Sequence, residues 1–415
     1  MKMKNWIKSG APWVWLNSAA VSASILLVGG LLLLIAVRGM AHFWPAGVHE
    51  FVLSNGKGDF TRLVGQVRER ETVPLERLGL EAVNLEGKDG LVTRVLIKTG
   101  NRDVDGEDFR WIVQEQVVQD ETPLSMTALE RQEWGTFFGY VVGLKSNGEL
   151  LETADVWVDF QKMLVRTSEI RDEIEDLEKD EIGSINYQLD RLRLEERELQ
   201  IKGDSDANEF ESIRQKKEVL QLEYEQIEAR LLVLYESISQ DSVVMRTGMN
   251  VGRDRELPLQ SILDAWQPNA LSLPEKFSHF LGKIWSFVSE DPREANTEGG
   301  IFPAIFGTIL MVLLMTVFVT PLGVIAGVYL KEYARQGFLT RAIRVAVNNL
   351  AGVPSIVYGV FGLGFFVYAL GGSIDQLFFE AALPTPTFGT GGLFWASLTL
   401  ALLTLPIVIV STEEG

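Results

Sequence analysis

Residues 16–37 run LNSAAVSASILLVGGLLLLIAV, 22 positions without one charged side chain. At the helical rise of 1.5 Å per residue the stretch is about 33 Å long, enough to cross the hydrocarbon core of a bilayer. Lys2, Lys4 and Lys8 precede it without an acidic residue. A secretory signal peptide has a shorter apolar core and a small-residue cleavage site, so we expect a retained membrane helix here with its N-terminus in the cytoplasm.

Three further apolar runs follow, over residues 301–330, 345–370 and 393–410. The loop at 331–344 has four basic residues and one acidic residue, whereas the loop at 371–392 has no basic residue. Basic loops stay on the cytoplasmic side of a membrane. The sequence therefore predicts four spans with one consistent orientation. The expected segments are a cytoplasmic N-terminus (1–15), a first span (16–38), an outside region (39–300), a second span (301–330), a cytoplasmic loop (331–344), a third span (345–370), an outside loop (371–392), a fourth span (393–410) and a cytoplasmic end (411–415).

Acidic residues are concentrated between the first two apolar runs. The chain has 56 acidic and 38 basic residues, and residues 39–300 hold 51 of the former and 30 of the latter, a net charge of -21. This acidity disfavours a nucleic-acid partner, because binding to phosphate backbones needs clustered Lys and Arg. The chain has no cysteine and three histidines, His42, His49 and His279, without a shared spacing. We therefore expect no disulfide, no metal site and no cofactor.

The first part of the outside region, residues 39–160, has the pattern of a small sheet-containing domain. Hydrophobic and charged residues alternate over 92–98, and Ser-Asn-Gly-Glu at 146–149 stands between two apolar stretches, 137–144 and 150–158. Asn-Gly between such stretches is typical of a tight hairpin turn. No carboxylate pair or nucleophile constellation emerges from the scattered acids, so we do not expect catalysis in this domain.

The second part, residues 161–240, has apolar side chains at alternating spacings of three and four, with a skip near Gly183. This heptad pattern and the polar segment at 203–208 predict an antiparallel coiled-coil hairpin, acting as a solvated spacer or as a docking arm for a protein partner. The third part, 241–300, is expected to be a linker that ends in an interfacial helix. The apolar stripe of that helix comprises Phe277, Phe280, Leu281, Ile284, Trp285 and Val288.

Polar residues and prolines interrupt the last three apolar runs. Each run contains one interior proline, Pro321, Pro354 or Pro406. Gly and Pro are common in membrane helices, so a single proline carries little information. The segment 348–355, Asn-Asn-Leu-Ala-Gly-Val-Pro-Ser, is more informative, because two amides at membrane depth are costly unless protein or a watery path surrounds them. We expect Asn348, Asn349 and Ser355 to line a translocation pathway.

Several segments together resemble the PstA-type permease subunit of the phosphate-specific ABC importer, in a version with a long insert after the first helix. They are NTEGGI (296–301), TPLGVIAGVYL (320–330) followed by EYA (332–334), LAGVPSIVYG (350–359), and LPIVI (405–409) with TEE (412–414). The sister subunit PstC shares part of the third segment, and the doubled Asn before it is closer to PstA. The resemblance covers residues 296–414 well and the first helix loosely.

The resemblance implies a mostly α, polytopic membrane protein of the type I ABC importer permease fold, placed in the bacterial inner membrane with its insert in the periplasm. It implies a PstC-like second permease subunit, PstB-like cytoplasmic ATPase subunits, a PstS-like periplasmic phosphate-binding protein, membrane lipid, and inorganic phosphate as substrate. ATP hydrolysis would belong to the ATPase partner, because no phosphate-binding loop of the G-x-x-x-x-G-K-[ST] type occurs here. Family members continue past the fourth span, so we expect this chain to be truncated.

Two arginines near the third run, Arg341 and Arg344, are candidates for an anion contact or for positive-inside anchors. Val410 stands where many family members have an arginine, so no anion-binding role is carried onto that position. The alternative function is a membrane-anchored structural or adaptor protein, in which the periplasmic hairpin docks an envelope partner.

Overall fold

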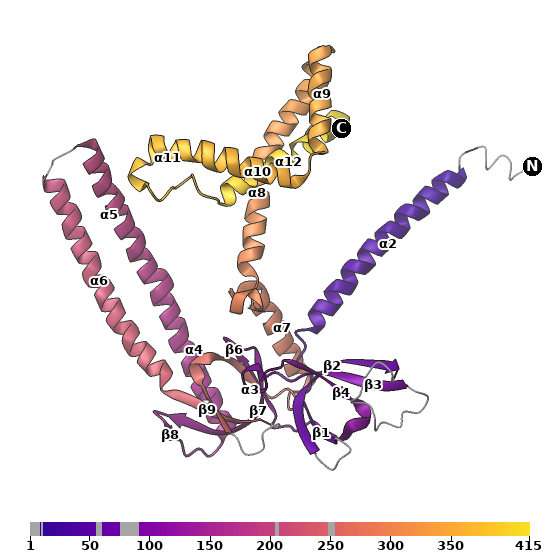
Figure 1. Ribbon diagram of the computed structural model, residues 1–415, viewed down its shortest axis with the longest axis vertical. Coiled ribbons are helices and arrows are strands. Elements are labelled where there is room, and N and C mark those ends of the chain that lie inside the picture. Colours follow the sequence, from indigo (N-terminus) through magenta and orange to yellow (C-terminus); the bar gives the residue numbers. More distant parts are fainter. Residues whose placement is uncertain (1–8, 10, 55–59, 75–90, 204–206, 248–253) are drawn as a thin grey trace, which may run out of the picture. The chain divides into compact units, whose positions relative to one another are not determined.

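The computed structural model describes residues 9, 11–54, 60–74, 91–203, 207–247 and 254–415 (Figure 1). Lys2, Lys4 and Lys8 and the centre of the expected polar turn, 204–206, lie outside the described residues. The chain divides into two compact units. The first comprises residues 1–168 and 239–300, and the second comprises residues 169–238 and 301–415.

The first unit begins with one long helix, α2 (Ala11–Ala41). Leu, Ile and Val side chains around its whole circumference are exposed, and Pro12–Ala41 is long and apolar enough to cross a membrane. A helix that is apolar on all sides is stable only in apolar surroundings, so the expected first span is confirmed as a membrane-spanning candidate.

Two antiparallel sheets follow in the first unit. The first has the strand order β4-β3-β2-β1-β5, with β1 (His49–Ser54), β2 (Phe60–Pro74), β3 (Leu91–Lys98), β4 (Phe109–Val113) and β5 (Val117–Glu121). The second has the order β10-β9-β7-β6-β11, with β6 (Thr127–Arg131), β7 (Thr136–Ser146), β9 (Asp241–Arg246), β10 (Asp254–Pro258) and β11 (Ile262–Trp266). The alternation at 92–98 thus belongs to a strand, β3, whose Val95 and Ile97 are buried.

The second sheet departs from the sequence prediction in two places. The expected turn at 146–149 is present, with positive φ at Asn147 and Gly148, but the returning strand β8 (Glu149–Leu150) is only two residues long. Helix α4 (Val156–Asp176) then begins, so 150–158 is not a long strand. The segment after residue 240, which we expected to be a linker, instead supplies β9, β10 and β11. Strand β9 pairs with β7, although the helical hairpin lies between these two strands in the sequence.

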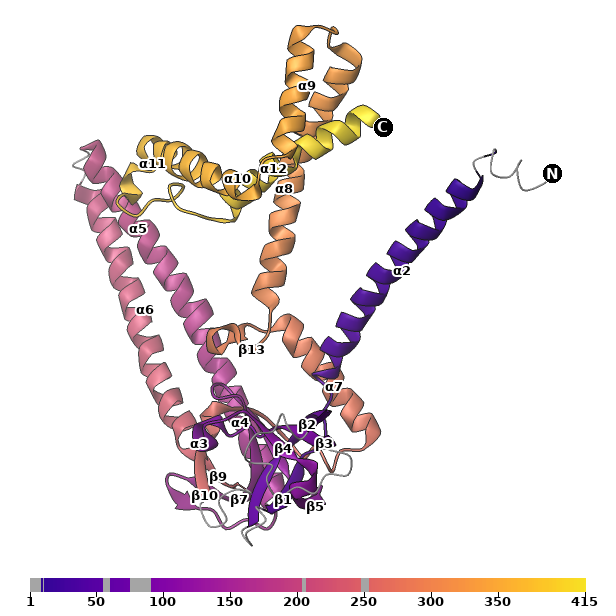
Figure 2. The ribbon, with the colours of Figure 1, turned by 45° about the vertical axis from the view of Figure 1, so that its right-hand side comes forward.

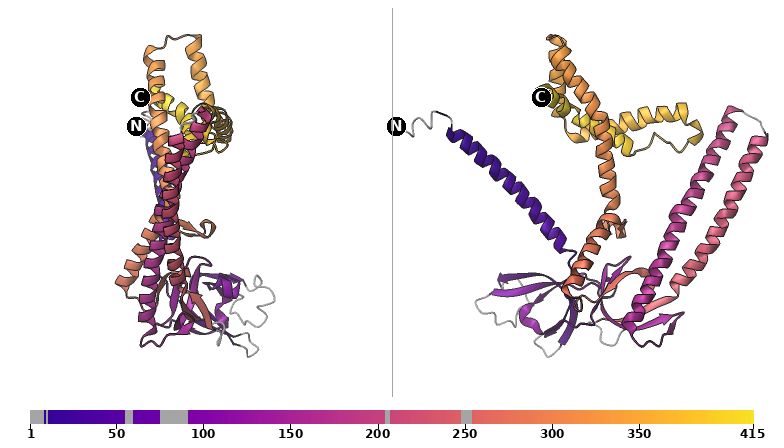
Figure 3. Two further views of the ribbon diagram at one scale, coloured as in Figure 1. Left: turned by 90° about the vertical axis from the view of Figure 1, so that its left-hand side faces the viewer. Right: turned by 180° about the vertical axis from the view of Figure 1, so that it is seen from behind.

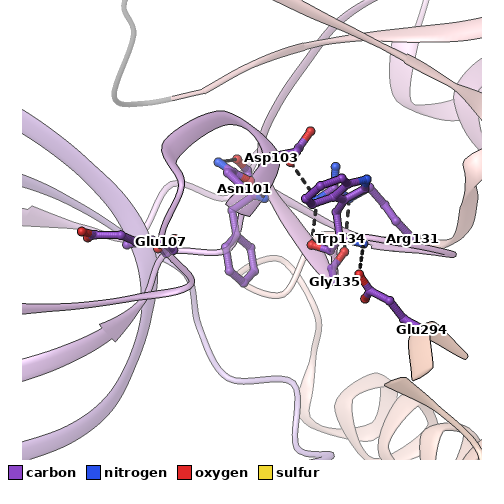
Figure 4. A network of polar contacts seen from close by, with 9 residues as sticks. Asn101, Asp103, Glu107, Arg131, Trp134, Gly135 and Glu294 are labelled. Atoms are coloured by element: carbon purple, nitrogen blue, oxygen red, sulfur yellow. Dashed lines mark hydrogen bonds and ion pairs between the residues drawn. The ribbon is translucent and has the colours of Figure 1, made fainter. Parts of the chain in front are cut away.

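Residues that precede the helical hairpin in the sequence and residues that follow it form one core against the second sheet. Phe160 and Leu164 of α4 pack with Phe137, Met245 and Ile262. A network of polar contacts surrounds the turn between β6 and β7 (Figure 4). The buried Arg131 contacts Asp103 (3.0 Å) and donates hydrogen bonds to the carbonyl oxygens of Trp134 and Gly135.

The predicted interfacial helix is α7 (Leu273–Ser289), which a capping box of Ser272 and Glu275 begins. Its stripe divides between two environments. Phe280 packs on Trp44, whereas Trp285, which is 71% exposed, is left uncovered. An uncovered aromatic stripe beside a membrane helix is typical of a helix at headgroup depth.

The second unit contains the helical hairpin, formed by the end of α4, a π-helical segment (Leu177–Glu181), α5 (Ile182–Lys202) and α6 (Ala207–Ser239). The two long helices lie side by side in every view (Figures 1 and 3). Their shared core contains the predicted apolar positions, among them Ile185, Leu192, Ile213 and Leu220. The π-helical segment explains the skip near Gly183, because an inserted residue rotates the apolar face.

The rest of the second unit is almost entirely helical. Its elements are α8 (Phe302–Val328), a π-helical turn (Tyr329–Tyr333), α9 (Phe338–Ala351), α10 (Ser355–Phe361), a π-helical segment (Gly362–Gly371), α11 (Gly372–Phe378) and α12 (Leu393–Glu414). Three stretches are long and apolar enough to cross a membrane, Phe302–Tyr333, Ser355–Phe378 and Leu393–Glu414. With α2 they make four candidate spans, as predicted.

The third span differs from its predicted bounds of 345–370. The helix stops at Ala351 and restarts at Ser355, and Figure 2 shows α9 and α10 running in different directions. Pro354 lacks an N–H group and restricts the residue before it, so it starts α10 instead of lying inside a helix. By contrast, Pro321 and Pro406 are inside helices, as expected.

Candidate functional site at the helix break

The break between α9 and α10 brings together the polar residues singled out from the sequence. Asn348 and Asn349 lie in the last turn of α9, and Ser355 is the first residue of α10. All three are exposed in the isolated chain, and no side-chain hydrogen bond is recorded for them within the part of the chain that the structure describes. Their amide and hydroxyl groups are therefore available to water, to a solute or to another subunit.

The backbone around the break is satisfied within the chain. Pro354 leaves the carbonyl oxygen of Leu350 without its helical donor, and the hydroxyl of Tyr358 donates to that oxygen at 2.8 Å. The N–H groups of Gly352 and Val353 donate to the carbonyl oxygens of Asn349 and Leu350. The chain itself therefore stabilises the break, because the buried Tyr358 of α10 hydrogen-bonds to α9.

The two candidate arginines occupy different environments. Arg344 contacts Glu413 of α12, with Nε 3.3 Å from Oε1, and donates from Nη2 to the carbonyl oxygen of Leu330 at 3.0 Å. Arg344 therefore joins α9, α12 and the end of the second span, and Glu413 balances its charge. Arg341 is exposed, and no ion pair is recorded for it among the described residues.

The loop between the third and fourth spans is held by one buried acid. Asp375 is 1% exposed, and its carboxylate accepts hydrogen bonds from the N–H groups of Phe388 and Gly389. The indole of Trp395 in α12 donates to the carbonyl oxygen of Phe388 at 2.7 Å. Both contacts are structural, because they satisfy backbone groups of the loop.

Taken together, the second unit has no group arranged for covalent chemistry among its described residues. It offers neutral hydrogen-bond donors and acceptors where the third candidate span, Ser355–Phe378, begins. Asn348 and Asn349 belong to α9, which precedes this span, so the expectation that they lie inside the third span is wrong. A basic residue, Arg341, lies about two helical turns before Asn348 in the same helix. These residues could be identified from the sequence, and the structure adds that they flank the break between α9 and α10.

Four candidate spans separated by polar connections define a polytopic membrane protein. Comparison with known proteins shows which kind of membrane protein the chain is similar to. The chain is 36% identical over 128 residues to the phosphate transport system permease protein PstA of Yersinia pestis, a match covering 31% of this chain and 37% of that protein. It is 35% identical over 130 residues to PstA of Mycobacterium leprae, covering 31% and 37% of the two chains.

A probable PstA of the archaeon Methanocaldococcus jannaschii is 32% identical over 119 residues, covering 29% of this chain and 36% of that protein. The resemblance to PstA-type permeases that the sequence motifs indicated is thus confirmed. The chain spans less than two fifths of the length of these relatives. It matches no protein-family model and no solved structure.

Proposed function

We propose that this chain supplies part of the membrane pathway for inorganic phosphate in an ATP-driven importer. The observation that carries the proposal is the similarity to three proteins named as phosphate transport permeases. The four candidate spans support it, since a permease must cross the membrane several times. In this role the chain is not an enzyme, and a partner ATPase hydrolyses ATP.

Within this function, Asn348, Asn349 and Ser355 line the pathway. They are exposed, they have no recorded side-chain partner among the described residues, and they flank the broken helix. Neutral donors suit a phosphate path, because they bind an oxyanion without holding it as tightly as a fixed cation does. Arg344 is already neutralised by Glu413, so it acts as a structural anchor at the inner end of the span.

Replacing both amides with leucine, N348L/N349L, is expected to reduce phosphate uptake by cells at least about tenfold, since each lost contact to an anion is worth about 1.5–3 kcal/mol. Radioactive phosphate uptake in cells measures the effect. Asn17→Leu in α2 is the matched control, because Asn17 is an exposed amide in another candidate span. Uptake unchanged in N348L/N349L, with normal protein levels, would remove the lining role.

The importer requires partners that this chain does not contain. We propose a second, PstC-like permease subunit, a pair of PstB-like ATPases and a PstS-like phosphate-binding protein, with the chain in the inner membrane. The orientation follows from charge. Basic residues cluster at 331–344, which we place in the cytoplasm, and residues 39–300 then lie in the periplasm.

One observation favours a second role, docking of an envelope protein by the hairpin. Apolar side chains are exposed on the surface of α6, including Leu222 (59%), Leu232 (67%) and Val233 (65%). A docking arm would use such residues as its contact surface. This adaptor role is compatible with transport, and it places the partner outside the membrane.

Protease treatment of intact spheroplasts tests both the orientation and the docking role. A glutamate-specific protease is expected to leave the hairpin, residues 169–238, protected in cells that contain the docked partner, and to cut it in the purified protein in detergent. Cleavage at equal rates in both preparations would contradict docking but support the orientation. Cleavage in the purified protein and in inside-out vesicles, without cleavage in spheroplasts, would show that the hairpin is cytoplasmic.

A further inference from the structure

The first unit contains a cavity of about 620 Å³ where α2 meets the two sheets and α7. We call it the α2 cavity. Its walls combine apolar groups, such as Met40, Phe43 and Phe287, with the cationic side chains of Arg68, Lys98, Lys283 and Arg293. Its volume lies within the range of small-molecule sites, about 300–1,000 Å³. Four cations in one wall are unexpected in a region whose net charge is strongly negative.

Two of these cations are without a direct carboxylate contact in the part of the chain that the structure describes. No ion pair is recorded for Arg68 or Lys98 within the described residues, although both side chains are half-buried. Arg68 Nη2 donates to the neutral amide oxygen of Gln66 at 3.1 Å, and Lys98 Nζ lies 3.4 Å from the hydroxyl of Thr136. A half-buried cation without a counterion is destabilising, so a bound anion would lower the free energy of this arrangement.

The carboxylates near the cavity form no ion pair with Arg68 or Lys98 among the described residues. Burial and then Arg68 lower the pKa of Lys98, and the charges of Glu298, Asp108 and Glu130, which raise it, do not outweigh them. Glu130 is already engaged by Lys283 and Arg293, each at 2.5 Å. Glu298 also borders the cavity but makes no recorded ion pair among the described residues, and burial raises its pKa. The positive charges also act on His42, which lines the same cavity. Burial, and then the charges of Arg68 and Lys98, lower the pKa of its imidazole.

Three residues of the cavity lining also carry a buried N–H group without an acceptor among the described residues. They are Nε of Arg68, Nε of Arg293 and Nε1 of Trp266. Buried donors are nearly always satisfied in folded proteins, by protein, by water or by a ligand. Together with the cations Arg68 and Lys98, a lining that includes these residues suits a ligand that is both anionic and rich in acceptor oxygens, which is the chemistry of a phosphoryl group.

We propose that the α2 cavity binds a phosphoryl group, held by Arg68 and Lys98 and by the indole N–H of Trp266. The source is either the headgroup of an anionic phospholipid or free phosphate. The headgroup is the better fit, because the cavity wall includes Gly39 and Met40 at the end of the candidate span α2. The uncovered stripe of α7 belongs at the same depth. This proposal does not depend on the transport function.

Thermal unfolding of the purified chain in neutral detergent tests the proposal. Three additives are compared: phosphatidylglycerol, phosphatidylcholine and inorganic phosphate. Phosphatidylglycerol is expected to raise the melting temperature of the wild type, with half-saturation at least about tenfold lower than in R68Q/K98Q, because a charge-assisted contact is lost at each position. Phosphatidylcholine, whose headgroup has no net charge, is expected to have little effect.

R70Q/R255Q is the matched control. It removes the same two positive charges at exposed positions without recorded ion pairs in the described part of the chain, and it should respond as the wild type does. If R68Q/K98Q fails to fold, Trp266→Phe replaces it and removes a single orphan donor. A response to phosphate in place of phosphatidylglycerol, lost in the variant, supports the proposal with free phosphate as the source. No response to either anion, or one equal in wild type and variants, overturns it and leaves water as the occupant.

Discussion

Gly323→Leu is expected to destabilise the membrane part of the chain by about 1–3 kcal/mol, because the added side chain has no room between α8 and α12. A Cβ atom at Gly323 would lie 2.5 Å from Cγ1 of Val408, and one at Gly327 would lie 2.7 Å from Cβ of Thr412. Small residues at such positions let two membrane helices approach closely, and this contact supplies van der Waals attraction that lipid cannot replace. Thermal unfolding in detergent, followed by the loss of monodisperse protein, measures the change.

The matched control for this prediction is Gly307→Leu in the same helix. Nothing lies within 4 Å of a Cβ atom at Gly307, so the substitution changes helix propensity and apolar surface equally without a collision. We expect Gly307→Leu to unfold at or above the wild-type temperature. Equal melting temperatures for the two variants would show that the packing of α8 on α12 is not held by the glycines.

The four spans could be predicted from the sequence because each depends on local composition. Long apolar runs and the basic loop at 331–344 are visible without any knowledge of contacts. The break at Gly352–Pro354 was missed for a related reason. Hydropathy continues through these residues, and proline is tolerated inside α8 and α12, so composition alone does not tell an interior proline from one that starts a helix.

The second sheet illustrates what a local pattern cannot give. Strands β7 and β9 pair from Tyr140 with Arg246 to Ser146 with Asp241, with one register shift at Val142, although the whole hairpin lies between them in the sequence. The segment after residue 240 is short and polar at its edges, so it resembled a linker. The hairpin itself was predictable, because its apolar spacing is local and its buried residues follow that spacing.

The cationic α2 cavity could not be predicted from the net charge, because the net charge sums over the whole region. The net charge of residues 39–300 is -21, and from it we inferred that a nucleic-acid partner is disfavoured. Arg68, Lys98, Lys283 and Arg293 come from four separate elements and share no sequence motif. Only the fold brings them together. Of the residues that we propose to line the pathway, Asn348 and Asn349 could be singled out from the sequence because two adjacent amides in an apolar run are costly unless protein or water surrounds them.

The charge cluster beside this cavity carries the second large expected effect. Glu130 on β6 accepts hydrogen bonds from Lys283 of α7 and from Arg293, and Lys283 also contacts Asp264 at 2.6 Å. Glu130→Gln is expected to destabilise the first unit by about 2–3 kcal/mol near neutral pH, because two half-buried cations lose their shared carboxylate. The estimate is below the full cost of a buried pair, since the Glu130 side chain is 26% exposed.

The pH dependence gives this prediction a definite sign. Burial opposes ionisation of Glu130, but Lys283 and Arg293 outweigh it and hold the pKa of the carboxyl below its ordinary value. The stabilisation is therefore complete above the pH at which an exposed glutamate titrates, about pH 4, and it disappears as the pH falls further through the lowered pKa. The melting temperatures of wild type and Glu130→Gln should differ most near neutral pH and converge in acid.

Glu133→Gln is the control for Glu130→Gln, because Glu133 is an exposed glutamate three residues away with no recorded ion pair among the described residues. It should unfold within about 0.5 kcal/mol of the wild type at every pH. At alkaline pH a second loss is expected in the wild type. Burial lowers the pKa of Lys283, but Asp264 and Glu130 outweigh it and raise the pKa overall, so its contribution persists until the ammonium deprotonates. A gap between wild type and Glu130→Gln that stays constant from pH 3 to neutrality would mean that the carboxylate charge does not join α7 to the sheet.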